Sequence, residues 1–88
     1  MKENRSPLEF PCSFPIKVMG RASERFELKV VAIVRRHVPD LGEGAVRTRL
    51  SREGRFVSVT VTIQAHSREQ LDALYRELSA DEETLMVL

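Results

Sequence analysis

The chain has 88 residues, 42% of them hydrophobic and 31% charged, with 14 basic and 13 acidic side chains. This length supports a single domain with one small core, and the composition is typical of a folded chain rather than a disordered one. The net charge of +1 excludes a strong overall field toward nucleic acid or membrane, and one cysteine excludes an internal disulfide.

The N-terminal residues 1–13 contain two prolines and mostly polar or charged side chains without a sustained period. They predict an extended or mobile segment ahead of a single domain that covers residues 14–88. The first residues lack the apolar run of a signal peptide, and no stretch reaches the roughly 18 apolar residues of a membrane span. Together with the single cysteine, these features predict a soluble, cytoplasmic protein.

The domain is expected to begin with a strand over residues 15–20, which alternates apolar and polar side chains and ends at Gly20. Residues 23–38 then change to a helical period. Ser23 is the predicted N-cap of this helix, and Pro39 stops it by restricting the residue before it. The apolar stripe of the helix has spacings of three and four and consists of Phe26, Val30, Ile33, Val34 and His37.

A hairpin and a second helix follow. Residues 46–51 and 55–65 alternate in polarity on either side of a turn that contains Gly54, which predicts two antiparallel strands. Ser67 is the expected N-cap of the second helix, and Gln70 three residues later completes a capping box. The apolar stripe of this helix is Leu71, Leu74, Tyr75 and Leu78.

A short strand over residues 84–88 completes the order strand, helix, strand, strand, helix, strand. Right-handed crossovers then favour a four-stranded antiparallel sheet with both helices on one face. This is the ferredoxin-like β-α-β-β-α-β sandwich, an α+β fold, in which the first and third strands are central. The strand over residues 55–65 fits a central place because one of its sides is apolar along most of its length.

Several phrases, taken in order and spacing, resemble a known family: Phe14-Pro15…Lys17-Val18-Met19-Gly20, Arg36-His37-x-Pro39, Ser51…Gly54-x-Phe56-x-Ser58-Val59, Leu74-Tyr75-Arg76-Glu77-Leu78 and Met86-Val87-Leu88. From about Leu8 to Leu88 the chain resembles the YbeD-like family of small, uncharacterised bacterial cytosolic proteins. The resemblance implies the ferredoxin-like fold and a shape similar to the ACT-type regulatory domains of amino-acid-metabolism enzymes. Suggested links of that family to lipoate synthesis imply a role in lipoate or amino-acid metabolism.

The sequence offers few residues that suit catalysis or metal binding. Nucleophile elbows and phosphate-binding glycine loops are absent, and Cys12 lies between prolines in the N-terminal segment, a poor place for a preorganised site. Cys12, His37 and His66 also lack the spacing of familiar metal sites, and His37 is expected to be partly buried at a helix end. We therefore expect a protein that is not an enzyme and that uses no metal and no cofactor.

Basic side chains gather on the predicted hairpin. Residues 1–60 carry twelve basic and seven acidic residues, whereas residues 61–88 carry two and six. A partner protein, a second copy of the chain or a polyanion are the candidate occupants of this surface. The RNA-binding version of this sheet needs stacking aromatics, whose usual pattern is not met, so nucleic acid is the alternative. Arginines on an edge strand also protect it from unwanted pairing, and both roles stay open. The candidate surface comprises Lys17, Arg47, Arg49, Arg52, Arg55, Phe56 and Ser58.

The turn after the first strand is the second candidate site. ACT-type domains bind amino acids near this turn, and here it contains Gly20, Arg21 and Ser23. A glycine permits close approach, the amides at a helix start suit a carboxylate, and an arginine adds a counter-charge. The simpler interpretation is that Gly20 only ends the strand. The sequence thus indicates a small non-enzymatic regulatory or binding protein, either sensing a metabolite or acting as an adaptor.

Overall fold

The protein is described by a computed structural model over residues 9–88. Most of the predicted N-terminal segment 1–13 therefore lies outside the described residues. Its last two residues, Cys12 and Ser13, already belong to the first strand, because they pair with Ala65 and Gln64. The strand thus begins three residues earlier than the alternation of the sequence predicts.

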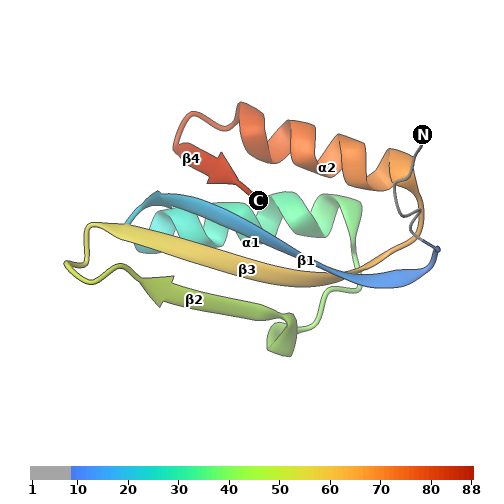
Figure 1. Ribbon diagram of the computed structural model, residues 1–88, viewed down its shortest axis with the longest axis horizontal. Coiled ribbons are helices and arrows are strands. Elements are labelled where there is room, and N and C mark those ends of the chain that lie inside the picture. Colours follow the sequence, from blue (N-terminus) through green and yellow to red (C-terminus); the bar gives the residue numbers. More distant parts are fainter. Residues whose placement is uncertain (1–8) are drawn as a thin grey trace, which may run out of the picture.

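The elements follow the predicted order, with a short 3-10 helix added directly before the second strand. They are β1 (Cys12–Arg21), α1 (Glu24–His37), η1 (Glu43–Ala45), β2 (Val46–Leu50), β3 (Phe56–Ala65), α2 (Arg68–Ala80) and β4 (Thr84–Val87). The sheet order is β2-β3-β1-β4 with antiparallel neighbours, and both helices cover one face (Figure 1). The predicted ferredoxin-like sandwich is confirmed. Within the described residues, neither helix is long and apolar enough to cross a bilayer.

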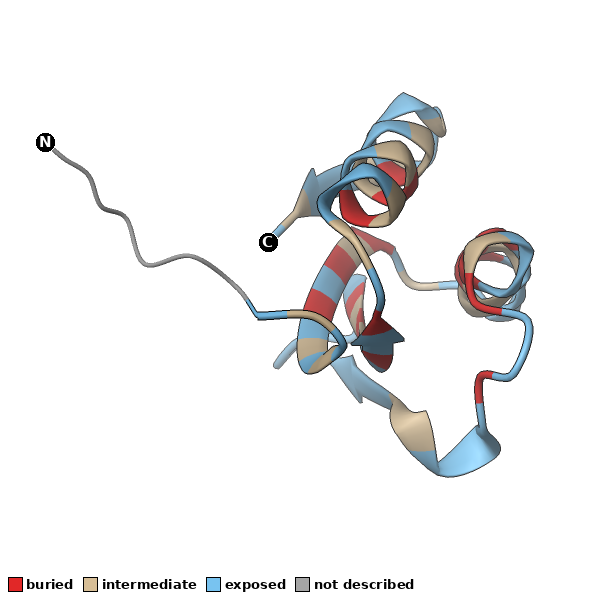
Figure 2. Ribbon diagram, turned by 90° about the vertical axis from the view of Figure 1, so that its right-hand side faces the viewer, coloured by how far each residue is buried: buried red, intermediate tan, exposed pale blue. Residues whose placement is uncertain are grey.

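The pairing of the two central strands sorts their side chains onto two faces. β1 and β3 pair over their whole lengths, from Cys12 opposite Ala65 to Arg21 opposite Phe56. Paired residues point to the same side of the sheet, and neighbours along a strand point to opposite sides. Figure 2 shows the resulting alternation of buried and exposed positions. The buried side chains of β1 and β3 that face the helices are Ile16, Val18, Val57, Val59, Val61, Ile63 and Ala65.

Helix α1 begins and ends where its capping residues predict. The Oγ atom of Ser23 accepts a hydrogen bond from the N–H of Phe26 at 3.1 Å, which satisfies one amide of the first turn. The helix stops at His37, two residues before Pro39. Its buried side chains are four of the five predicted ones, Phe26, Val30, Ile33 and Val34.

Helix α2 departs from its predicted capping box in one bond. The Oγ atom of Ser67 accepts from the N–H of Gln70 at 3.0 Å, as expected. The return bond goes to the residue before the cap: the Oε1 atom of Gln70 accepts from the N–H of His66 at 2.6 Å. The Nε2 atom of Gln70 also donates to the carbonyl of His37 at 3.0 Å. One amide side chain therefore joins the start of α2 to the end of α1.

Candidate binding surfaces

The face of the sheet turned away from the helices brings together five of the seven predicted surface residues: Lys17, Arg47, Arg49, Phe56 and Ser58. Arg47 lies opposite Thr60, and Thr60 lies opposite Lys17, so the two cations flank one position of β3. Arg49 lies opposite Ser58 in the neighbouring row. Lys17, Arg47, Arg49 and Ser58 line one shallow hollow of about 450 Å³. Among residues 9–88, no ion pair involves these three basic side chains.

Apolar side chains adjoin this basic half of the face. Met19 lies opposite Met86 of β4, and Met19, Phe56 and Arg49 line a second, smaller hollow. Leu88 is held beside β1 by two main-chain hydrogen bonds with Lys17, of 3.2 and 2.8 Å. Met86 and Leu88 are 51% and 59% exposed, and the predicted surface did not include either residue. We call this surface the open face: Lys17, Met19, Arg47, Arg49, Phe56, Ser58, Met86 and Leu88.

The two remaining predicted basic residues do not join the open face. Arg52 and Arg55 lie in the turn between β2 and β3, beside Gly54, whose φ of 73° is in the left-handed region. The Nε atom of Arg55 lies 3.5 Å from Oε1 of Glu53, and both side chains are largely exposed. The turn arginines line neither hollow of the open face. The structure thus divides the predicted surface into a strand part and a turn part.

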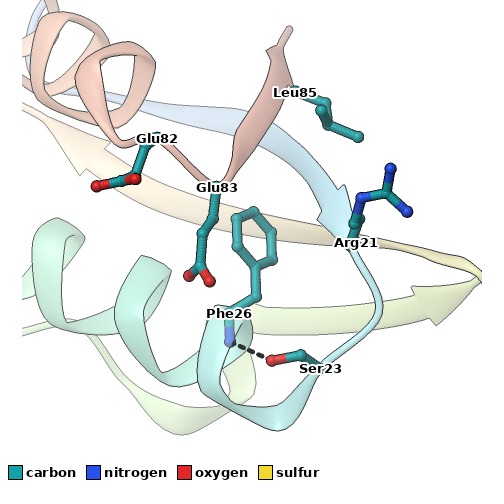
Figure 3. Close-up of a pocket in the computed structure, with 6 residues that line it drawn as sticks. All are labelled: Arg21, Ser23, Phe26, Glu82, Glu83 and Leu85. Carbon is teal, nitrogen blue, oxygen red and sulfur yellow. Dashed lines mark hydrogen bonds between the residues drawn. The ribbon is translucent and has the colours of Figure 1, made fainter.

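The turn between β1 and α1 borders a separate hollow of about 270 Å³ (Figure 3). Two of the three predicted ligand residues, Arg21 and Ser23, line it. The Ser23 hydroxyl is already engaged as the helix cap, whereas Arg21 is exposed. The hollow carries charges of both signs because the connection between α2 and β4 reaches it. Its full lining is Arg21, Ser23, Phe26, Glu82, Glu83 and Leu85.

Gly20, the third predicted ligand residue, has a packing role in this structure. A Cβ atom at this position would lie 2.6 Å from Cζ of Phe26 and 2.8 Å from the main-chain oxygen of Glu83. The missing side chain therefore admits the Phe26 ring from α1 against β1, and it leaves no open space over the Gly20 Cα for a ligand. Arg21 and Ser23 line the hollow, and their role as ligand contacts stays a prediction.

Lys29 of α1 forms an ion pair with Glu83, which lines this hollow on the side opposite Arg21. Its Nζ atom forms ion pairs with Glu83 and, at 3.3 Å, with Asp81. The hydrogen bond to Glu83 raises the pKa of Lys29 above its usual value. Lys29 engages the carboxylate of Glu83, which is still 43% exposed, whereas Glu82 is exposed and forms no ion pair among residues 9–88.

The histidines and the cysteine lie apart from both surfaces. His37 is partly buried as expected, and its Nε2 atom lies 2.7 Å from Oε1 of Glu77 on α2. Arg36 pairs with the same carboxylate, so this cluster joins the two helices. Cys12 lies at the start of β1 and is half-buried. In residues 9–88 no three His, Cys, Asp or Glu side chains gather in a way that suits a metal ion.

Comparison with known proteins identifies the family of this sequence and agrees with the observed fold. Residues 5–88 match the family described as "Protein of unknown function (DUF493)". The chain belongs to this family. DUF493 relatives include a UPF0250 protein of Nitrosomonas europaea, 47% identical over 83% of this chain and 84% of its own length. Another, from Chromobacterium violaceum, is 44% identical over 98% and 97%. The resemblance to the bacterial YbeD-like proteins is thereby confirmed.

Two solved structures share the fold of this DUF493 chain. The solution structure of protein HP0495 from H. pylori has a TM-score of 0.73 at 10% identity, covering 96% of this chain and 88% of that one. The C-terminal domain of the MgtC protein from Mycobacterium tuberculosis has a TM-score of 0.66 at 20% identity, covering 86% and 82%. At these identities the likeness concerns the fold alone.

Proposed function

We propose that the protein is a non-catalytic binding module that acts as an adaptor in the bacterial cytoplasm and contacts a partner protein through the open face. The observation that carries this proposal is the side-by-side arrangement, on one face of the sheet, of exposed apolar side chains and basic side chains that form no ion pair among residues 9–88. Protein interfaces are enriched in methionine, aromatic residues and arginine, and arginine and aromatic side chains dominate their binding energy. The open face offers all three types.

The size of the open face suits such a contact. The four strands hold 29 residues, ten each in β1 and β3, five in β2 and four in β4. At about 3.3 Å along a strand and about 4.8 Å between strands, they span roughly 460 Å². The surface is therefore of the same order as the roughly 800 Å² that each partner buries in a standard interface. Arg49 and Met86 lie on either side of the Ser58–Met19 pair, so a partner that spans this row would contact both halves.

The test is capture of binding proteins from bacterial lysate by the intact chain and by point variants. Met86→Glu and Arg49→Glu alter the two halves of the open face. Leu28→Glu is the matched control, because Leu28 is 70% exposed on α1 and lies on the opposite side of the molecule. We expect the wild type and the Leu28 variant to retain the same protein and both open-face variants to lose it. Retention by the open-face variants, with loss in the Leu28 variant, would contradict the proposal.

A second candidate function is supported by the hollow beside the β1–α1 turn. Two residues selected from the sequence, Arg21 and Ser23, line it next to the exposed Glu82. An arginine and a carboxylate on opposite sides suit a small ligand with both an acidic and an amino group, such as an amino acid. Metabolite sensing of the ACT type, in amino-acid or lipoate metabolism, is therefore the alternative to the adaptor role.

A thermal-shift screen with amino acids and lipoyl precursors tests this second candidate. A ligand at 100 times its Kd stabilises the folded chain by about 2.7 kcal/mol, which raises Tm by about 10 °C or more in a domain of this size. Arg21→Gln should remove the shift in Tm. Arg25→Gln changes an exposed arginine in the first turn of α1 that does not line the hollow, and it should leave the shift in Tm unchanged. The absence of any shift at millimolar ligand counts against metabolite sensing.

Polyanion binding is the remaining alternative and needs its own measurement. The basic half of the open face supplies Lys17, Arg47 and Arg49, but Phe56 is the one aromatic side chain there. Single-strand binding modules combine such cations with several stacking aromatics. Titration with a mixed single-stranded oligonucleotide at low and moderate salt decides the question, since contacts to phosphate weaken steeply with salt. Absence of binding at low salt removes this alternative.

A further inference from the structure

Strand β2 has a free outer edge, and the side chains next to that edge are exposed on both faces of the sheet. β2 is the first strand in the sheet order, so one of its edges has no neighbouring strand within residues 9–88. Thr48 and Leu50 point to the side of the helices, yet both are exposed, Leu50 by 61%. The helices pack mainly against β1, β3 and β4, and in β2 only Val46 is half-buried against the core. Any segment that joins this edge therefore meets free side chains on both faces.

The main-chain groups that point outward from this edge follow from one hydrogen bond. The N–H of Ser51 donates to the carbonyl of Phe56 at 2.8 Å, so this pair is of the hydrogen-bonded type. Such pairs alternate along antiparallel strands, and Arg49 and Arg47 therefore turn their main-chain groups toward β3. Thr48 and Leu50 turn theirs outward, where each offers one donor and one acceptor.

We propose that the outer edge of β2 accepts an extended acidic segment of a partner protein as a fifth strand. The carboxylates of that segment lie opposite Arg47 and Arg49 on the open face. Its alternate side chains are apolar and lie opposite Thr48 and Leu50 on the other face. Main-chain hydrogen bonds supply affinity and the alternate side chains supply specificity, as in other cases of strand addition. This inference rests on the proposed adaptor function, for which it names the class of partner.

Charge complementarity distinguishes this occupant from a second copy of the chain. If two β2 strands paired antiparallel about a two-fold axis at Thr48, Arg47 of each would lie opposite Arg49 of the other. A register centred on either arginine places that residue opposite its own copy. Like charges directly opposite on neighbouring strands are destabilising, whereas opposite charges stabilise the pair. The two arginines therefore disfavour self-pairing and favour a partner strand rich in Asp or Glu.

The direction of the edge groups also distinguishes a peptide from a nucleic acid. Thr48 and Leu50 each present an N–H and a C=O outward, and a polypeptide backbone satisfies both kinds of group. A DNA backbone carries acceptor oxygens and no donor, so it would leave the two carbonyls without a partner, and RNA adds only its 2′-OH as a donor. An oligonucleotide would contact only the arginine side chains. It would therefore leave the amides of Thr48 and Leu50 unprotected from hydrogen exchange in the experiment below.

The experiment uses the full chain labelled for NMR and a blocked peptide of alternating glutamate and valine that is two residues longer than β2. We expect the amides of Thr48 and Leu50 to gain protection from hydrogen exchange when the peptide binds. The same peptide with glutamine in place of glutamate should bind about three- to tenfold more weakly, since two opposite-charge pairs are lost. Binding that leaves both amides unprotected, or equal binding of the two peptides, overturns the inference.

A matched pair of variants tests the main-chain contact itself. Thr48→Pro removes the outward N–H and leaves the bonds to β3 in place, and proline is tolerated on edge strands. Thr48→Val keeps the N–H and the branched shape. We expect the proline variant to lose peptide binding and the valine variant to keep it. Equal binding by the two variants overturns the inference, and so does a dimer or an oligonucleotide complex that protects the same amides.

Lysate capture with the same variants separates the two proposals. If Met86→Glu loses the partner and Thr48→Pro keeps it, the open face binds a partner without the edge of β2, and only the fifth-strand inference fails. If Met86→Glu and Arg49→Glu keep the partner, the adaptor proposal fails. Loss in Met86→Glu and Thr48→Pro, with retention in Thr48→Val, supports both proposals.

Discussion

Replacing Gly20 by alanine tests the close approach of α1 to β1. The added Cβ would meet two atoms of the Phe26 ring at 2.6 and 2.7 Å and the main-chain oxygen of Glu83 at 2.8 Å. To restore a 3.4 Å contact from 2.6 Å, the ring would have to move by about 0.8 Å. Phe26 is 1% exposed and packs among core side chains, so a shift of its ring would disturb those contacts. We therefore expect the change to force α1 or the Glu83 main chain away from β1.

Overpacking of a filled core costs about 1–3 kcal/mol, and here a buried ring and a main-chain atom are both displaced. We expect Gly20→Ala to lower the free energy of unfolding by about 2–3 kcal/mol, which corresponds to a fall in Tm of at least about 8 °C for a domain of this size. Urea unfolding followed by circular dichroism measures the loss as a lower midpoint at unchanged slope.

Two comparisons isolate the cause of this loss. Gly44→Ala adds the same methylene where no atom lies within 4 Å, and it should change stability by less than about 0.5 kcal/mol. In a Phe26→Leu background the clash with the ring is removed and only that with the Glu83 main chain remains, so Gly20→Ala should cost at least about 0.5 kcal/mol less than in the wild type. A wild-type midpoint for Gly20→Ala, or full additivity with Phe26→Leu, would refute the packing role of this glycine.

Three further predictions concern the helices and the single tyrosine. Ser67→Ala should cost about 1 kcal/mol in urea unfolding, because the N–H of Gln70 loses its cap; no loss would show that water replaces it. Leu74→Ala should cost about 2–5 kcal/mol and Leu28→Ala less than about 0.5, since these side chains are 0% and 70% exposed; equal losses would contradict the placement of α2. Burial raises the pKa of Tyr75 above 10.0, so a phenolate absorbance titration should show a later midpoint. The folded state then holds the proton longer, and stability should fall as pH rises above 10; a midpoint at or below 10.0 contradicts this.

The fold follows from the sequence because its periods are unambiguous. The alternation from Val57 to Ile63 and the caps at Ser23 and Ser67 predict the strand and both helix starts. The start of β1 was harder to predict, because the prolines flanking Cys12 are typical of loops. Pairing with Ala65 nevertheless extends the strand to Cys12. Because Ala65 is distant in the chain, no pattern in the residues around Cys12 predicts this pairing.

The candidate surfaces were only partly predictable. Strand alternation was enough to place Lys17 and Arg47 on one face, and the structure confirms that placement. Sequence could not show that Arg55 pairs with Glu53 in the turn, apart from that face. It also could not show that Phe26 fills the space at Gly20, since the two meet only when α1 packs back on β1. Contacts of this kind depend on how the layers meet.

The long pairing of β1 with β3 has a consequence for the order in which the chain assembles. Its partners lie 35 residues apart at Arg21 and Phe56 and 53 apart at Cys12 and Ala65, so the central ladder must close a large loop. β2 and β4 each pair with a single strand, β2 with β3 and β4 with β1, and β2 buries little apolar surface. Edge opening therefore needs less free energy than global unfolding, and β2 can separate and re-form while the central ladder stays intact.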